Sequence, residues 1–132
     1  MAAQGSGYIL QVGSTAVFML GPLQAVYFAT KVFVYSFSQA LDQELRCDGV
    51  TCTVLAPGFI QTEFANSTNL GGTNLTKSGT SPQSVAKHGY DAMIARKIVT
   101  VNERRLIILI QWVIPLLPRR TLLKMIQKMQ SK

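Results

Sequence analysis

Residues that bind metals or form disulfides are scarce in this sequence of 132 residues. It contains one histidine, His88, and two cysteines, Cys47 and Cys52, with no CxxC pair. Such a spacing matches neither a zinc site nor a disulfide framework. We therefore expect no metal, a structural role for His88 and a core position for Cys52. The low cysteine content favours a reducing, cytoplasmic compartment.

Charged residues and long hydrophobic runs are also few. Charged residues make up 14% of the chain and hydrophobic residues 48%, which argues against disorder and for one domain with a buried core. The apolar stretch Leu106–Leu117 is interrupted by Pro115, and its twelve residues are too few to cross a bilayer as a helix. The sequence before Tyr8 has neither the basic start nor the apolar core of a signal peptide.

Acidic residues are nearly absent from the tail of the chain. Residues 94–132 contain nine lysines or arginines and one acid, Glu103, for a net charge of +8. Residues 1–93 contain four lysines or arginines and five acids, for a net charge of −1. The tail therefore predicts either an anionic partner, such as a membrane surface, nucleic acid or an acidic protein, or a solvated basic face.

The end of this tail has the pattern of a basic amphipathic helix, in which Lys124 and Lys128 lie opposite an apolar stripe. The stripe consists of Leu122, Met125, Ile126 and Met129. We expect residues 104–132 to lie on an anionic membrane surface or to cover a hydrophobic substrate entrance, without nucleic-acid contact. The alternative is a tail packed on the core, with its lysines and arginines exposed for solubility.

A strand, a long helix and a second strand follow one another early in the chain. Tyr8–Val12 is a short apolar run that indicates a buried strand, and apolar residues at helical spacing predict a helix over 22–46 with a proline in its first turn. Val50–Ala56 is β-branched and apolar, as a strand buried on both faces would be. This order predicts a βαβ unit with a parallel sheet. Asp42 and Arg46 are expected to form a surface ion pair on the helix.

The rest of the chain completes an α/β fold. Residues 59–81 are polar and rich in Gly, Ser, Thr and Asn, which is typical of a functional lid or a disordered segment. A helix is expected from Ser81 to about Ala95, and Lys97–Val101 predicts a last strand. We expect one α/β domain over 1–102, followed by the basic tail 103–132.

Tyr27 and Lys31 stand four residues apart on the expected helix and therefore share a face. An ammonium beside a phenol stabilises the phenolate, so such a pair can exchange a proton with an alcohol or carbonyl near neutral pH. Ser14 follows the first expected strand, where its hydroxyl can hold the same substrate oxygen. Ligands of open α/β sheets bind beyond the carboxyl ends of strands, where Ser14 and Pro57-Gly58 both lie.

Two stretches carry a family resemblance, GSGYILQVGSTAVFMLGPLQAVYFATKVFVYSFSQALDQEL and GVTCTVLAPGFIQTEF. The chain resembles the short-chain dehydrogenase/reductase family over residues 5–64, and more loosely over residues 80–102. The resemblance implies the C-terminal, catalytic half of a Rossmann-like, doubly wound parallel sheet. It also implies that Tyr27 is the general acid/base, that Lys31 stabilises the phenolate and binds the nicotinamide ribose, and that Ser14 orients the substrate.

The same resemblance implies four further residues at a nicotinamide cofactor, which is NAD or NADP. Pro57 and Gly58 would flank the nicotinamide. Ile60 would offer backbone contacts there, and Thr62 would lie near the carboxamide. Residues after Thr62 would form a substrate lid.

The sequence departs from the family pattern in its first half. A complete member begins with a Gly-rich phosphate turn after its first strand and later carries an Asn-Asn-Ala-Gly motif, and neither occurs here. One interpretation is an NAD(P)-dependent oxidoreductase of a carbonyl or secondary alcohol, including a lipid-like one, of which these 132 residues alone are inactive. The alternative is a truncated, inactive paralogue that acts as a binding module, through a homo-oligomer formed by helix 22–46 or through the tail 104–132.

Overall fold

The computed structural model describes residues 1–60, 80–103, 112 and 116–130. The strands are β1 (Gly7–Val12), β2 (Val50–Leu55) and β3 (Val99–Thr100), and the α-helices are α1 (Ala25–Leu45), α4 (Pro82–Ile94) and α6 (Arg119–Gln130). Three short 3-10 helices are η1 (Ala2–Gln4), η2 (Thr15–Phe18) and η3 (Arg46–Asp48).

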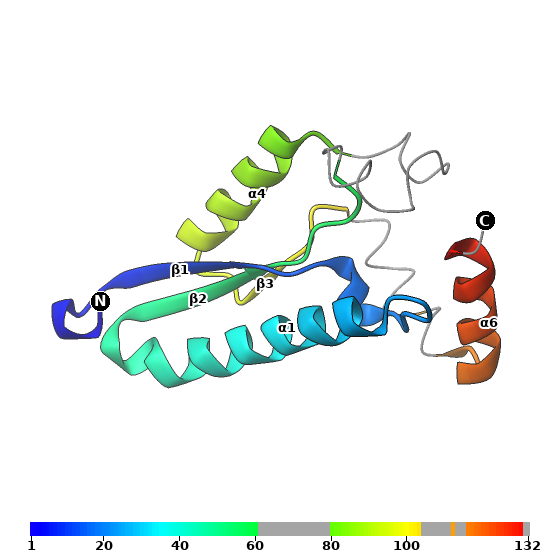
Figure 1. Ribbon diagram of the computed structural model, residues 1–132. Coiled ribbons are helices and arrows are strands. Elements are labelled where there is room, and N and C mark those ends of the chain that lie inside the picture. Colours follow the sequence, from blue (N-terminus) through cyan, green and yellow to red (C-terminus); the bar gives the residue numbers. More distant parts are fainter. Residues whose placement is uncertain (61–79, 104–111, 113–115, 131–132) are drawn as a thin grey trace.

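The three strands form one parallel sheet in the order β1-β2-β3. In the register of the sheet, Val12 of β1 lies opposite Leu55 of β2, and Val54 lies opposite Val99 of β3. Helix α1 lies on one side of the sheet and α4 on the other (Figure 1). The predicted βαβ unit and the α/β class, a partial Rossmann-like doubly wound sheet, are confirmed.

Strand β2 is the centre of the core, since all six of its residues are buried. It is covered by α1 on one face and by α4 on the other. The close approach of α4 depends on Gly89, where a Cβ would lie 2.8 Å from the Cδ2 of Leu55. Ser81 begins this helix as predicted, with its Oγ accepting a hydrogen bond from the N–H of Ser84 at 3.3 Å.

Helix α1 begins at Ala25, three residues later than the sequence predicted. Residues Gly21–Gln24 form a turn instead, closed by a hydrogen bond of 3.2 Å from the Gln24 N–H to the Gly21 carbonyl. Leu23 has a φ of 69° there. Pro22 in the second position and a positive φ in the third are what a type II turn requires. The proline therefore serves a turn rather than the first turn of the helix.

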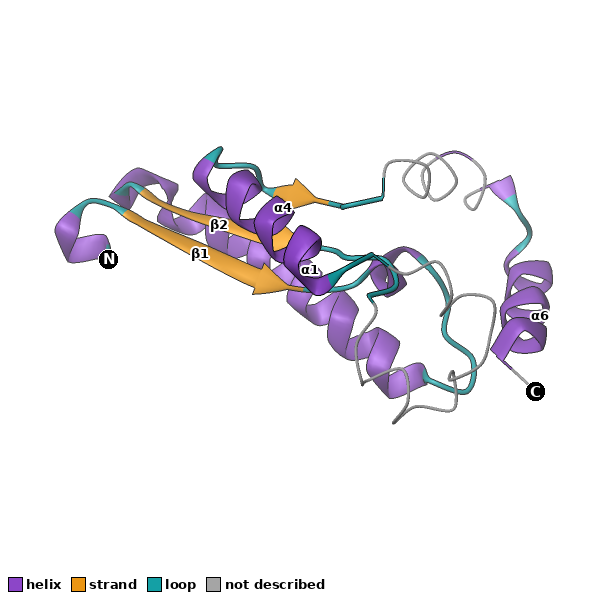
Figure 2. Cartoon of the chain, turned by 90° about the horizontal axis from the view of Figure 1, so that it is seen from above, coloured by secondary structure: helices purple, strands orange, loops and turns teal. Residues whose placement is uncertain are grey.

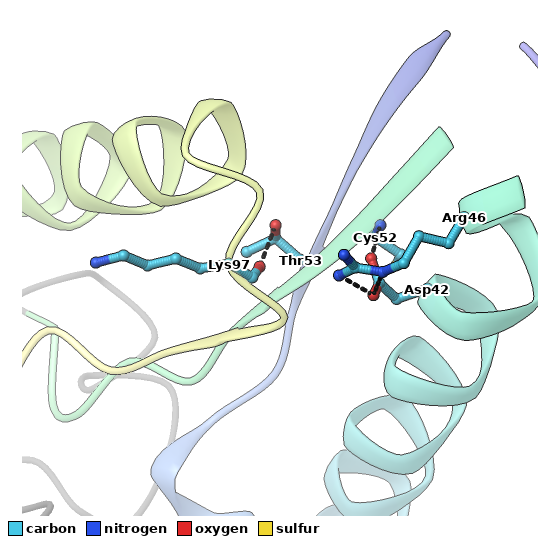
Figure 3. A network of polar contacts seen from close by, with 5 residues as sticks. All are labelled: Asp42, Arg46, Cys52, Thr53 and Lys97. Atoms are coloured by element: carbon cyan, nitrogen blue, oxygen red, sulfur yellow. Dashed lines mark hydrogen bonds and ion pairs between the residues drawn. The ribbon is translucent and has the colours of Figure 1, made fainter. Parts of the chain in front are cut away.

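Asp42 is buried, so the prediction of a surface ion pair was wrong for this residue. Its side chain is 2% exposed, whereas that of Arg46 is 44% exposed. Oδ2 accepts hydrogen bonds from the guanidinium of Arg46, and Oδ1 accepts one of 2.8 Å from the backbone N–H of Cys52 (Figure 3). Cys52 is fully buried, as expected.

The length of β3 explains this use of a carboxylate. Strand β3 pairs only with Val54 and Leu55 of β2, and its neighbour Ile98 accepts the hydrogen bond from the Val54 N–H. The N–H of Cys52 points to the same edge, because alternate N–H groups of a strand share a side. Asp42 reaches this edge from α1 and accepts the hydrogen bond that a longer β3 would have accepted.

The predicted amphipathic helix of the tail is present as α6, beginning at Arg119. Leu122 and Ile126 of the apolar stripe are 5% and 7% exposed and pack within the chain, whereas Met125 is 47% exposed. Both views place α6 beyond the carboxyl ends of the strands (Figures 1 and 2). None of the helices in the described part of the chain is long and apolar enough to cross a membrane. Most of the predicted apolar stretch Leu106–Leu117 and of the predicted loop 59–81 lies outside the described residues.

Candidate active site

Ser14 lies where β1 ends and the chain turns into η2. The preceding Gly13 is still hydrogen-bonded to β2, because its N–H donates to the Leu55 carbonyl at 2.7 Å. The Ser14 Oγ accepts a hydrogen bond of 3.1 Å from the N–H of Ala16 and so caps η2. Because a hydroxyl both donates and accepts, its proton is not used in this contact. A substrate oxygen at this end of the sheet could therefore accept it.

Lys31 links helix α1 to the same end of β1. Its Nζ donates a hydrogen bond of 3.4 Å to the carbonyl of Val12, the last residue of β1. The same Nζ lies 5.8 Å from the centre of the Tyr27 ring. The helical spacing thus places the ammonium next to both the phenol and the strand end, as expected from the sequence. This arrangement places the ammonium over the Tyr27 ring.

The turn after β2 is held next to the turn after β1. The N–H of Thr15 donates to the carbonyl of Pro57 at 2.9 Å. Because Thr15 follows Ser14 directly, this bond brings the Pro57-Gly58 turn beside the end of β1. The carboxyl ends of adjacent parallel strands therefore form one edge, which carries Ser14 and Pro57-Gly58 as expected.

Sequence reasoning missed Asn102, which contacts two of these segments. Its Oδ1 accepts a hydrogen bond of 3.0 Å from the N–H of Gly58, and its Nδ2 donates to Thr80 Oγ1 at 3.4 Å. Thr80 also pairs with Ile60 in an isolated parallel bridge, and its N–H donates to the Phe59 carbonyl at 3.1 Å. The position of Asn102 just beyond the last strand was the signal that could have revealed it.

The contacts of His88 and Cys52 indicate structural roles. The Nε2 of His88 lies 2.7 Å from the Oγ1 of the buried Thr100 in β3, in a bond that joins α4 to the sheet. Burial raises the pKa of the Cys52 thiol, and the nearby Asp42 carboxylate adds to this effect. A thiol held in its neutral form is a poor nucleophile, so Cys52 belongs to the core rather than to a site.

Of the sequence-predicted site residues that the structure describes, Ser14, Lys31, Pro57, Gly58 and Ile60 lie at or after the carboxyl ends of β1 and β2, and the Tyr27 ring is located by its contact with Lys31. Thr62 lies outside the described residues.

Comparison with known sequences shows the family of this chain. Residues 1–71 match the family described as "short chain dehydrogenase". An uncharacterized oxidoreductase of Staphylococcus saprophyticus is 30% identical over 103 residues, which cover 78% of this chain and 42% of the relative. One from Staphylococcus aureus is also 30% identical over 103 residues and is covered to 43%. The chain thus spans less than half the length of these relatives.

Solved structures share the fold. A structure solved to explain the stereoselectivity of 7beta-hydroxysteroid dehydrogenase matches with a TM-score of 0.75 at 21% identity, over 98% of this chain and 50% of that chain. A short-chain dehydrogenase from Sphingobium yanoikuyae, solved in complex with NADPH, has a TM-score of 0.69 at 24% identity, over 81% of this chain and 41% of that chain. A short-chain dehydrogenase/reductase from Burkholderia phymatum, solved in complex with NAD, has a TM-score of 0.71 at 21% identity, over 84% of this chain and 48% of that chain. Together with the match over residues 1–71, the parallel sheet and the Tyr27–Lys31 spacing on α1, this places the chain in the short-chain dehydrogenase family.

Proposed function

We propose that this chain carries the proton-transfer half of an NAD(P)-dependent oxidoreductase that reduces a carbonyl or oxidises a secondary alcohol. One observation carries the proposal most directly. The Lys31 ammonium lies 5.8 Å from the centre of the Tyr27 ring and 3.4 Å from the Val12 carbonyl at the end of β1. The cation thus lies near both the Tyr27 ring and the end of β1, and ligands of open α/β sheets bind beyond such strand ends.

In the direction of carbonyl reduction, the Tyr27 hydroxyl donates its proton to the carbonyl oxygen and becomes a phenolate. The positive charge of Lys31 stabilises that phenolate through its proximity to the ring. Ser14 donates a second hydrogen bond to the same oxygen and so orients the carbonyl. In the oxidation of an alcohol the same residues act in reverse, with Tyr27 as the general base.

The residues present fit the nicotinamide end of such a cofactor, which would supply or accept the hydride when bound. The Lys31 ammonium is a donor for ribose hydroxyls, and Pro57-Gly58 is a turn with no side chain on its second residue at the edge of the sheet. Gly58 does not offer its N–H, because Asn102 accepts it. Ile60 and Thr62 complete the proposed contacts. We propose NAD or NADP without preference, since solved relatives of the same fold bind NADPH and NAD.

An apolar, lipid-like substrate suits this end of the sheet. Val12, whose carbonyl binds Lys31 at the end of β1, exposes its side chain to solvent. Apolar side chains beside a catalytic centre favour a ligand that removes them from water.

The binding part of the proposal is tested with saturation-transfer NMR on the purified chain in the presence of NADPH or NADH. We expect saturation of the nicotinamide and adjacent ribose protons and much less of the adenine protons, because the sequence has no Gly-rich turn for the pyrophosphate. Lys31→Met should remove most of this transfer. Lys87→Met, which removes an exposed lysine on α4, is the matched control and should leave it unchanged. Equal saturation transfer in the unaltered chain, Lys31→Met and Lys87→Met would contradict the proposed site.

A second candidate function is a binding module that uses the tail 103–132. The structure favours electrostatic contact here, because α6 has a buried apolar face and an exposed basic face. Leu122 and Ile126 pack inward, whereas Arg120 and Lys124 are exposed. On a helical wheel these two basic residues lie roughly opposite the buried pair. An anionic membrane surface would thus meet the basic side, with about 1 kcal/mol from each basic residue.

Vesicle flotation decides on this second function. The intact chain should float with anionic but not with neutral vesicles, and added salt should weaken the binding. The double variant Arg120→Gln/Lys124→Gln should float less. The control Lys87→Gln/Lys97→Gln removes the same charge from exposed positions elsewhere and should float like the unaltered chain. The absence of flotation at low salt would exclude the membrane surface as a partner.

The same alternative includes pairing with a second copy through α1. Phe33 and Phe37 stack on this helix with their ring centres 5.8 Å apart, and both are exposed. Exposed stacked aromatic rings favour burial against a partner. Sedimentation velocity should show a dimer that Phe33→Ser dissociates, and a monomer at every concentration would exclude this role.

A further inference from the structure

Asn102 joins three backbone segments at the carboxyl end of the sheet. It is the second residue after β3, and β3 is fixed at its end by the hydrogen bond of 2.8 Å from the Ala56 N–H to the Thr100 carbonyl. From this anchored position its Oδ1 accepts from the Gly58 N–H at 3.0 Å, and its Nδ2 donates to Thr80 Oγ1 at 3.4 Å. A single amide side chain thus contacts the turn after β2 and Thr80, which lies two residues before α4.

Gly58 is held from two directions. Asn102 accepts its N–H, and the Glu103 carboxylate packs against its Cα, since a Cβ on Gly58 would collide with that carboxylate. The next residue is held as well, because the Thr80 N–H donates to the Phe59 carbonyl at 3.1 Å. A partly buried N–H that loses its acceptor is costly, so without Asn102 the turn would rotate toward another partner.

We propose that Asn102 is a positioning residue that fixes the backbone of the Pro57-Gly58 turn for a bound nicotinamide. This inference rests on the proposed function, in which the turn flanks the nicotinamide. In this proposal Asn102 acts through the turn, because its Oδ1 accepts from Gly58 and its Nδ2 donates to Thr80. A turn that is already in its bound conformation loses less freedom when the ligand binds.

The competing explanation is an ordinary structural hydrogen bond that stabilises the sheet edge. Thr53 provides the matched control, because its Oγ1 donates to the Lys97 carbonyl at 2.6 Å and so also ties β2 to the segment around β3 (Figure 3). Thr53→Val removes a comparable side-chain bond between β2 and the segment around β3. It leaves the Gly58 turn untouched.

The test combines two measurements on the full chain. Amide hydrogen exchange at Gly58 is followed by NMR, and the affinity for reduced nicotinamide mononucleotide is measured by titration. In Asn102→Ala, we expect Gly58 exchange to be roughly tenfold faster and affinity to be roughly tenfold weaker, as the loss of one neutral hydrogen bond implies. Asn102→Asp keeps an acceptor for the Gly58 N–H and should stay within about threefold of the unaltered chain in exchange. Thr53→Val should change neither value at the site.

Two results would overturn the proposal. One is unchanged Gly58 exchange in Asn102→Ala, and the other is an equal loss of affinity in Asn102→Ala and Thr53→Val. If the unaltered chain binds no nicotinamide mononucleotide, the proposed function fails for this chain. The exchange at Gly58 then still decides whether Asn102 holds the turn, so the two failures remain distinguishable.

Discussion

At the residue scale, Asp42 shows how a buried carboxylate is tolerated in this core. Burying a charge is costly unless hydrogen bonds and an opposite charge compensate it. Asp42 has both, since the Cys52 N–H donates to one oxygen and the Arg46 guanidinium to the other. Because Arg46 is 44% exposed, solvent screens its charge, and the bond to the backbone contributes the larger share.

This account predicts that Asp42→Ala lowers the free energy of unfolding by about 1–3 kcal/mol, because the buried Cys52 N–H loses its acceptor. The matched control is Asp91→Ala. Asp91 also forms an i,i+4 ion pair, with Lys87, but is 57% exposed, so the loss should be below about 0.5 kcal/mol. Urea denaturation measures both values. Equal losses in the two variants would show that Asp42 contributes only as a surface pair.

Cys52 makes stability depend on pH in a defined direction. Burial first, and then the Asp42 carboxylate, raise the pKa of its thiol in the folded state. As pH rises above the ordinary thiol pKa of about 8.5, the unfolded chain releases the proton while the folded chain keeps it. The contribution is therefore fully present below that pH and is lost as pH rises toward the folded pKa, by up to about 1.4 kcal/mol per pH unit.

The measurement compares the unaltered chain with Cys52→Ala by urea denaturation at about pH 8 and about pH 10. The unaltered chain should lose more free energy of unfolding over this interval. Cys47 is present in both proteins and cancels in the comparison. The same loss in both would mean that the folded thiol ionises as it does in the unfolded chain.

At the element scale, the start of α1 stores backbone strain at Leu23. A leucine with a positive φ costs about 1–2 kcal/mol relative to the right-handed region, and its side chain is 66% exposed, so little apolar burial is at stake. Leu23→Gly should relieve this cost, offset in part by the greater freedom of glycine in the unfolded chain. We expect thermal unfolding to show unchanged or higher stability, by up to about 1 kcal/mol. Leu23→Ala keeps the strain and should give no gain.

The sequence predicted elements well wherever one periodicity dominated. The βαβ order, the spacing of Tyr27 and Lys31 and the amphipathic α6 follow from local patterns, and the structure has them. Features set by distant contacts were not predictable in this way. Asp42 is buried because β3 is too short to pair with Cys52, and Asn102 matters because it meets Gly58 across 44 residues of chain. The burial of Asp42 leaves no mark in the local sequence, and the position of Asn102 beyond the last strand does not reveal its partner.

At the scale of the whole molecule, the purified chain should not oxidise NADPH or NADH steadily with a carbonyl substrate. The sequence has no Gly-rich turn after a strand, so nothing in it is expected to hold the pyrophosphate, and much of the cofactor's binding energy is missing. Absorbance of the reduced nicotinamide measures this directly. Steady oxidation that Tyr27→Phe abolishes would refute the expected inactivity while supporting the role of Tyr27.

The central claim is that the nicotinamide end of the cofactor binds at the carboxyl edge of the sheet. Titration of the isotope-labelled chain with reduced nicotinamide mononucleotide, followed by backbone amide NMR, tests it most directly. The account predicts shifts at Ser14, Lys31 and Gly58, with no change at Gly49, which directly precedes β2. Shifts that spare the carboxyl edge, or none at millimolar ligand, would contradict it.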